Sequence, residues 1–298
     1  MAEPIKHHFS PVFYLRGWCD STTGKLIEYS RPYEDVIARP VHPAATGYAR
    51  SLYTMEGLPD DQKQTIEKDY MAAKVDDPAA KALRVLLGTN TNALTEEMRR
   101  AWTRFLLVSL HRRPAAVAEI GDTFRAVLRQ NLLADTSYES DKQEGDPSTR
   151  FEWMEKHHPH LIDDAAKEMV VRATENQNIG NVIINMQWST LDMSASRHEL
   201  LTGDMPHLRF GGLKDPKCAI VFPLSPKKLF IATHDRRVEH EINRRNRTDV
   251  VRSINDNIAR IAESYVYGGT DSHLRFVERR LRLPDSPVFG SVGAAASP

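Results

Sequence analysis

Residues 7–18 read His7-His8-Phe9-Ser10-Pro11-Val12-Phe13-Tyr14-Leu15-Arg16-Gly17-Trp18, and this stretch sets the first part of the fold. Ser10 followed by Pro11 is typical of an N-cap and a first helical turn, where proline loses no hydrogen bond. We expect a short helix from Pro11 to about Trp18, with Tyr14 and Trp18 four apart on one face. We also expect the segment to complete a sheet whose other strands lie about 180 residues later.

Two short strands are expected next along the chain. Thr23-Gly24 indicates a turn into residues 25–29, which have the apolar and aromatic content of a strand. Residues 36–41 form a candidate partner strand. Pro40 and Pro43 limit that partner to the edge of a sheet, because proline cannot donate to the hydrogen-bond ladder.

The pattern from about residue 60 to about residue 187 is helical. Its clearest member is a helix that Thr95 caps, with Glu96 and Glu97 in the first turn and an apolar face that includes Trp102. Pro114 terminates this helix. We expect this whole block to be an insertion between strands.

Strand patterns return at residues 188–193, 199–202, 219–222 and 229–233. A last helix carries an apolar stripe from Val250 to Tyr265 and is closed by Gly268-Gly269. The order favours an α+β fold: a mixed or antiparallel sheet built from N- and C-terminal strands, with a large inserted helical block. We expect residues 1–283 to form a single domain and residues 284–298, rich in Pro, Gly, Ala and Ser, to be a disordered tail.

Composition narrows the class of protein. Lys plus Arg and Asp plus Glu number 40 each, so no global charge favours nucleic acid or an anionic membrane. The two cysteines, Cys19 and Cys218, lie far apart, and neither a signal core nor an apolar run of membrane-spanning length occurs. These features favour a cytoplasmic protein without a membrane partner. The P-loop, dinucleotide-binding, nucleophile-elbow and HExxH zinc motifs do not occur.

Four blocks of the sequence resemble a known family. His8-Phe9-x-Pro11-x-Phe13-Tyr14-Leu15-Arg16 resembles the opening signature of the bacterial domain-of-unknown-function family 4238 (DUF4238). Residues 201–206 (LTGDMP), 222–227 (FPLSPK) and 255–267 are similar to later blocks of that family, in the family's order. Gly203 stands where the family commonly has serine, which removes a hydroxyl beside Asp204. The resemblance implies a bacterial origin and no assigned activity, so neither an enzymatic reaction nor a cofactor follows from it.

The candidate catalytic residues are His8, Tyr14, Arg16 and Asp204. A neutral imidazole at His8 could act as a base, Arg16 could bind a carboxylate or phosphate, and Asp204 complements both. Arg113 and Ser225 are candidate binding residues. The alternative is that these side chains bond to backbone groups and fix the segment on the sheet. No metal site is expected, because Pro159 interrupts the His157–His160 run and no acidic pair completes it.

Three functions remain open. The first is a pocket of His8, Tyr14, Arg16 and Asp204 that binds or hydrolyses a small anionic, phosphate-bearing ligand. The second is a nucleic-acid-associated or nuclease-like defence protein with a basic face at Arg244, Arg245 and Arg247, although interleaved acidic residues dilute that face. The third is a non-catalytic interaction protein. The sequence does not decide the oligomeric state.

Overall fold

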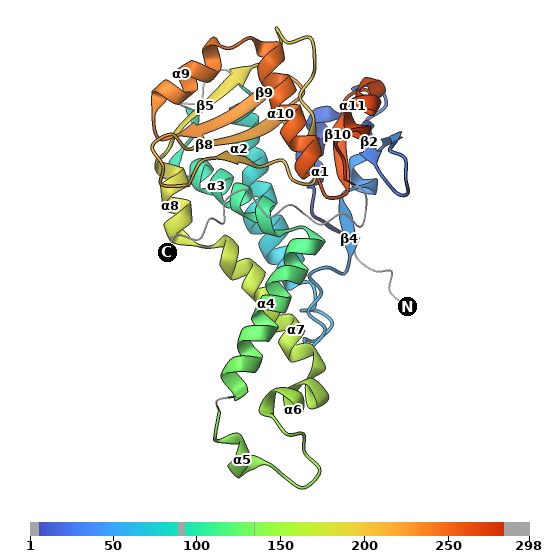
Figure 1. Ribbon diagram of the computed structural model, residues 1–298, viewed down its shortest axis with the longest axis vertical. Helices are drawn as coiled ribbons and strands as arrows, with labels where there is room; N and C mark the ends of the chain where they lie inside the picture. The colour runs from blue at the N-terminus through green and yellow to red at the C-terminus, as the bar shows by residue number, and fades with distance from the viewer. Residues whose placement is uncertain (1–5, 89–92, 134, 283–298) are drawn as a thin grey trace.

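The computed structural model describes residues 6–88, 93–133 and 135–282. In Figure 1 the strands gather in one body, and helices α4 (Pro114–Leu133), α6 (Arg150–His157) and α7 (Pro159–Thr174) extend from that body as an arm. The short helix α5 (Tyr138–Asp141) lies at the tip of the arm. Only Ala116 is buried in α4, whereas α7 contributes Val170 to the main hydrophobic core.

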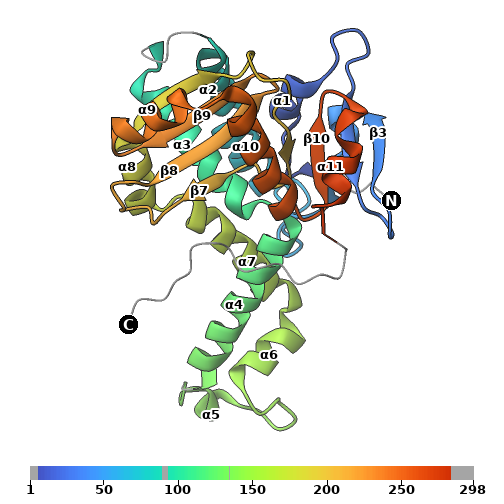
Figure 2. The same cartoon turned by 45° about the horizontal axis from the view of Figure 1, so that its top comes forward.

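The remaining helices lie in the same body as the strands (Figure 2). They are α1 (Val12–Leu15), η1 (Arg16–Trp18), η2 (Pro43–Ala45), the π-helix η3 (Ile66–Asp76), α2 (Asp77–Leu87), α3 (Glu96–His111), α8 (Gln177–Asn185), α9 (Arg236–Arg244), α10 (Arg247–Ile261), η5 (Asp271–His273) and α11 (Leu274–Glu278).

One antiparallel sheet joins the two ends of the chain, as predicted. Its strand order is β3 (Ile37–Val41), β2 (Leu26–Ser30), β10 (Tyr265–Gly268) and β6 (Thr202–Gly203). The predicted edge position of the Pro40 strand is confirmed, because β3 pairs with β2 and lies at the end of this order. A separate two-stranded pair consists of β1 (Lys6–His8) and β4 (Tyr48–Arg50).

A second antiparallel sheet is built from C-terminal strands alone, which the sequence did not predict. Its order is β5 (Gln187–Asp192), β9 (Lys228–Thr233), β8 (Ala219–Ser225) and β7 (Leu208–Phe210). Side chains of β8 and β9 alternate between two cores, since successive residues of a strand face opposite sides. Phe222 and Phe230 pack with Trp102 of α3, whereas Val221 and Ile231 pack with Ile254 of α10. This sheet therefore lies between the helical block and α9–α10 (Figure 2).

The α+β class and the inserted helical block are confirmed, since described helices fill the chain from Ile66 to Asn185. Thr95 caps α3 as predicted and accepts a hydrogen bond from the Met98 amide at 3.2 Å. The expected tail, residues 284–298, lies outside the described residues, and the single domain over residues 1–283 stays a prediction.

Two local predictions were wrong. Ser10 is not the N-cap of the first helix, because Pro11 occupies that position. The last long helix ends at Ile261, and Tyr265 belongs to β10 instead. The apolar pattern continues from α10 into β10 because the helix and the strand both bury apolar side chains. The pairing of β10 with β2 and β6 makes this last segment a strand.

Candidate functional site

Tyr14 ties the first helix to both sheets. Its hydroxyl donates to the Pro223 carbonyl at 2.8 Å and shares a hydrogen bond with the Thr202 hydroxyl at 2.6 Å. The side chain is 1% exposed, and burial raises the pKa of Tyr14 well above its usual value. A phenol that is neutral and has both of its hydrogen bonds filled holds structure, and it is not positioned to exchange a proton with a ligand.

Trp18, one helical turn after Tyr14, also bonds to a distant segment of the chain. Its indole donates to the Leu200 carbonyl at 2.8 Å, and its ring meets the Tyr14 ring edge-on at 5.1 Å between centroids. Beside it, a Cβ on Gly17 would lie 3.2 Å from the Leu224 carbonyl. The first family block thus packs directly on the blocks at residues 201–206 and 222–227. We call this junction the motif core.

Asp204 organises the turn between α10 and β10. Its carboxylate accepts backbone hydrogen bonds from Glu263 at 3.0 Å, Ser264 at 2.6 Å and Tyr265 at 3.0 Å. Burial raises the pKa of Asp204 to about 6, although the amides of Ser264 and Tyr265 and the charge of Arg113 act to lower it. The preceding Gly203 has no room for a side chain, since a Cβ there would lie 2.8 Å from the Tyr265 carbonyl. A glycine at this position therefore fits the close approach of β10.

Arg113, a predicted binding residue, is buried and forms an ion pair with Glu263. It also donates to the Leu110 carbonyl at 3.3 Å. Burial lowers the pKa of Arg113, while Asp204 acts to raise it. Arg113 thus joins the end of α3 to the turn that Asp204 holds.

Arg112, which the sequence analysis did not select, is more deeply buried than Arg113 at 1% exposure. Its guanidinium donates to Asp76 at 2.9 and 3.3 Å and to the His8 carbonyl at 2.6 Å. Tyr53 donates from its hydroxyl to the Arg112 carbonyl at 2.7 Å. A bidentate pair with a carboxylate is the strongest geometry available to arginine. Arg112 therefore joins β1, η3 and the end of α3.

Two titratable groups surround this ion pair, and we call His8, Glu67, Asp76 and Arg112 the charge cluster. Burial raises the pKa of Glu67 to about 7, although Arg112 acts to lower it. Burial and Arg112 both lower the pKa of His8, whereas its bond to the Ala44 backbone raises it. Within the described chain, His8 Nε2 and Glu67 Oε2 are buried without a hydrogen-bond partner.

The structure does not bring the four predicted catalytic residues together. Arg16 is exposed, and His8 Nε2 bonds to neither Arg16 nor Asp204. Ser225 accepts from the Lys227 amide at 3.4 Å in the turn between β8 and β9. Tyr14 and Asp204 do line one cavity, yet its volume of about 10 Å³ admits no more than roughly one water molecule. This cavity has no room for an organic ligand.

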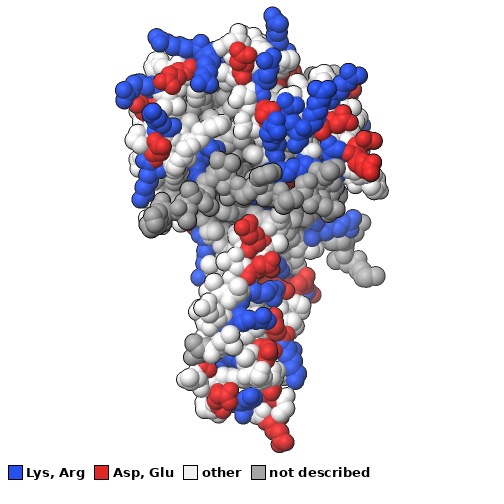
Figure 3. All heavy atoms as spheres, viewed as in Figure 1, with Lys and Arg blue, Asp and Glu red and all other residues white. Residues whose placement is uncertain are grey.

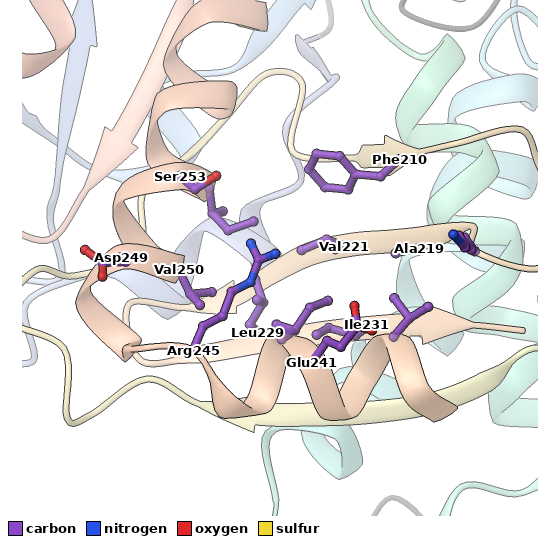
Figure 4. Close-up of a pocket in the computed structure, with 14 residues that line it drawn as sticks. Phe210, Ala219, Val221, Leu229, Ile231, Glu241, Arg245, Asp249, Val250 and Ser253 are labelled. Carbon is purple, nitrogen blue, oxygen red and sulfur yellow. The ribbon is translucent and has the colours of Figure 1, made fainter. Parts of the chain in front are cut away.

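A larger cavity, of about 280 Å³, opens on the other face of the second sheet. Figure 4 shows it between strands β8 and β9 and helices α9 and α10. Its lining is mostly apolar: Phe210, Ala219, Val221, Leu229, Ile231, Val238, Ile242, Val250 and Ile254. We call this cavity the α9–α10 pocket. Its size is near the lower end of the range for small-molecule sites.

Charged side chains stand at the pocket's rim. Lys217, Glu241, Arg245 and Asp249 all line it. In Figure 4, Arg245 and Glu241 extend over the apolar strand residues, whereas the carboxylate of Asp249 points away. Asp249 pairs with Arg252 at 3.7 Å, and no ion pair within the described chain engages Lys217, Glu241 or Arg245. The pocket thus combines an apolar interior with charged groups that are free to bind.

Comparison with protein families places these blocks in one family. A model described as a protein of unknown function, DUF4238, matches residues 6–272. The chain belongs to the DUF4238 family. Comparisons with curated proteins and with solved structures found no match. In this DUF4238 protein, three of the four blocks that resemble the family meet at the motif core.

None of the helices among the described residues is long and apolar enough to cross a membrane. No group of three His, Cys, Asp or Glu side chains within those residues could hold a metal ion. Figure 3 shows Lys and Arg interspersed with Asp and Glu on the face in view, both on the body and on the arm.

Sequence reasoning missed the α9–α10 pocket although part of its signal was visible. The cluster around Arg245 had been noted as a basic stretch, and the apolar stripe of α10 as a buried face. The second sheet was not predicted, and the pocket depends on it. The pairing of β8 with β9 is what places Val221 and Leu229 opposite α10.

Proposed function

We propose that this DUF4238 protein binds a small molecule with an apolar body and an acidic group in the α9–α10 pocket. The observation that carries the proposal is the pocket itself: an apolar cavity of about 280 Å³ beneath a guanidinium, Arg245, that has no ion-pair partner in the described chain. Apolar walls with a few convergent polar groups are the usual form of a ligand site.

Size and charge narrow the ligand class. At about 30 Å³ per water, the cavity has the volume of roughly nine water molecules, which suits a ligand of about ten non-hydrogen atoms. Three charged side chains at the rim have no ion pair within the described chain: Lys217, Glu241 and Arg245. Two of them are cations and one is an anion, so the rim favours a ligand with an acidic group over a ligand with a basic group. The anionic ligand expected from the sequence is retained, and its proposed site moves from the motif core to this pocket.

An NMR titration with 3-phenylpropanoate and its neutral amide tests this proposal. We expect the carboxylate to bind about tenfold more tightly than the amide, because a charge-assisted hydrogen bond to Arg245 is stronger than a neutral one. Ser253→Trp, which places an indole at the mouth of the pocket, should abolish binding. His240→Trp on exposed α9, outside the pocket lining, is the matched control. Equal binding of the acid and the amide, or full binding by Ser253→Trp, would contradict the proposal.

A further inference from the structure

The rim of the α9–α10 pocket offers an acceptor as well as a donor. Glu241 and Arg245 are four residues apart, a spacing at which glutamate and arginine on a helix usually pair. Here no ion pair between them is formed, although both line the pocket. The backbone explains the separation: Arg245 is the C-cap of α9 with φ −71° and ψ 155°, which is extended and not helical.

The side chains diverge as that backbone requires. In Figure 4 the guanidinium of Arg245 lies over the strands near Leu229 and Val221, and Glu241 reaches toward Ile231 from the preceding turn of α9. Both charged groups thus lie over one apolar floor, and no ion pair joins them. A ligand that carries both an acidic and an ammonium group would satisfy both.

We infer that the pocket recognises a zwitterion with an apolar side chain, the chemistry of a free apolar α-amino acid. Its carboxylate binds Arg245, its ammonium group binds Glu241, and its side chain lies on the floor formed by Val221, Leu229 and Ile231. The inference rests on the proposed function and specifies the ligand class of the same site. Ser253 of α10 also lines the pocket.

Leucine and phenylalanine have nine and twelve non-hydrogen atoms, and the cavity is sized for about ten. A ligand whose side chain carries a second acidic group would place that charge on the apolar floor, which is costly. A basic amino acid would place its second cation on an apolar floor without a partner, which is costly. Acidic and basic amino acids are therefore both disfavoured as ligands.

The test compares phenylalanine with 3-phenylpropanoate, which lacks only the ammonium group. In NMR titrations of the full chain, phenylalanine should bind about tenfold more tightly, because its ammonium group makes a charge-assisted bond to Glu241. Glu241→Gln should remove this advantage and leave the affinity for 3-phenylpropanoate equal or higher. The neutral side chain is close in shape, so the ratio of the two affinities isolates the ammonium–carboxylate contact.

The outcomes separate the two proposals. If 3-phenylpropanoate binds as tightly as phenylalanine, the zwitterion inference is wrong while the acidic-ligand proposal stands. If Glu241→Gln weakens the binding of both probes equally, Glu241 shapes the pocket and does not bind the ammonium group. The zwitterion inference is then also wrong. If neither probe binds the unmodified chain, both proposals fail. His240→Trp should behave as the unmodified protein in every titration.

Discussion

The motif core and the α9–α10 pocket differ in where their polar groups find partners. In the motif core, Tyr14, Trp18 and Asp204 each bond to backbone groups of distant segments and are buried. In the pocket, Arg245 and Glu241 stand over an apolar floor and pair with no described residue. The sequence blocks that carry the family resemblance therefore include residues that hold the fold, and the cavity large enough for a ligand lies on the other face of the second sheet.

This difference has a consequence for mutations. A substitution in the motif core or in the charge cluster should change stability, because it leaves buried groups without partners. A substitution at the mouth of the pocket should change binding, because those side chains carry little of the fold. Four predictions compare substitutions in the motif core and charge cluster with a substitution in the pocket, from the largest expected change in the free energy of unfolding to the smallest.

Replacing Arg112 should have the largest effect. Arg112→Met leaves Asp76 without its bidentate partner and the His8 carbonyl without its donor, which should cost about 3–4 kcal/mol of unfolding free energy. Urea denaturation measures this cost. Arg16→Met removes the same charge from an exposed site and should stay within about 0.5 kcal/mol. Equal costs for the two variants would mean that the buried ion pair does not hold the fold.

Glu67 should make stability depend on pH. Burial raises its pKa from 4.5 to about 7, so the folded state disfavours the charged carboxylate, and stability falls as the pH rises from 4.5 through 7. Glu67→Gln removes this loss. We expect the variant to be more stable than the unmodified protein by about 1–3 kcal/mol at pH 8, and to match it near pH 4. Urea midpoints across this range that fall equally for both proteins would contradict the assignment.

Removing the Tyr14 hydroxyl should have an intermediate effect. Tyr14→Phe keeps the ring contacts with Trp18 and Phe222 and leaves the Pro223 carbonyl and the Thr202 hydroxyl without this partner. The expected cost is about 1–2 kcal/mol in urea denaturation, with no change in ligand affinity. A loss of binding at unchanged stability would return Tyr14 to the list of functional residues.

Blocking the pocket should have the smallest effect on stability. Ser253 is exposed on α10, so Ser253→Trp should change the unfolding free energy by no more than about 0.5 kcal/mol while it abolishes binding of 3-phenylpropanoate. Thermal unfolding of Ser253→Trp beside His240→Trp checks the stability. A large destabilisation confined to Ser253→Trp would mean that the mouth of the pocket is packed as part of the core.

The elements with local signals were predictable from the sequence. Thr95 and Pro114 bound α3 through capping and through the missing proline amide, and Pro40 marked the edge strand β3. The strand at Tyr265 was not predictable locally, because a helical stripe and a buried strand both present apolar residues. Its pairing with β2, more than 230 residues earlier, decides its structure.

The candidate site also depends on contacts that local sequence does not predict. Arg113 was predicted as a binding residue, yet its neighbour Arg112 has the deeper burial and the contact with β1. Which of two adjacent arginines faces the core depends on how α3 ends against η3, and this is a matter of tertiary packing. The pocket depends likewise on a β8–β9 register that no short motif encodes.

Phenylalanine titrated in parallel into Tyr14→Phe and Ser253→Trp tests the central claim most directly, because one variant alters the motif core and the other alters the pocket. We predict that Tyr14→Phe binds phenylalanine with the affinity of the unmodified protein and that Ser253→Trp does not bind it. Loss of binding by Tyr14→Phe together with full binding by Ser253→Trp would contradict the account and place the ligand site back among the family's sequence blocks.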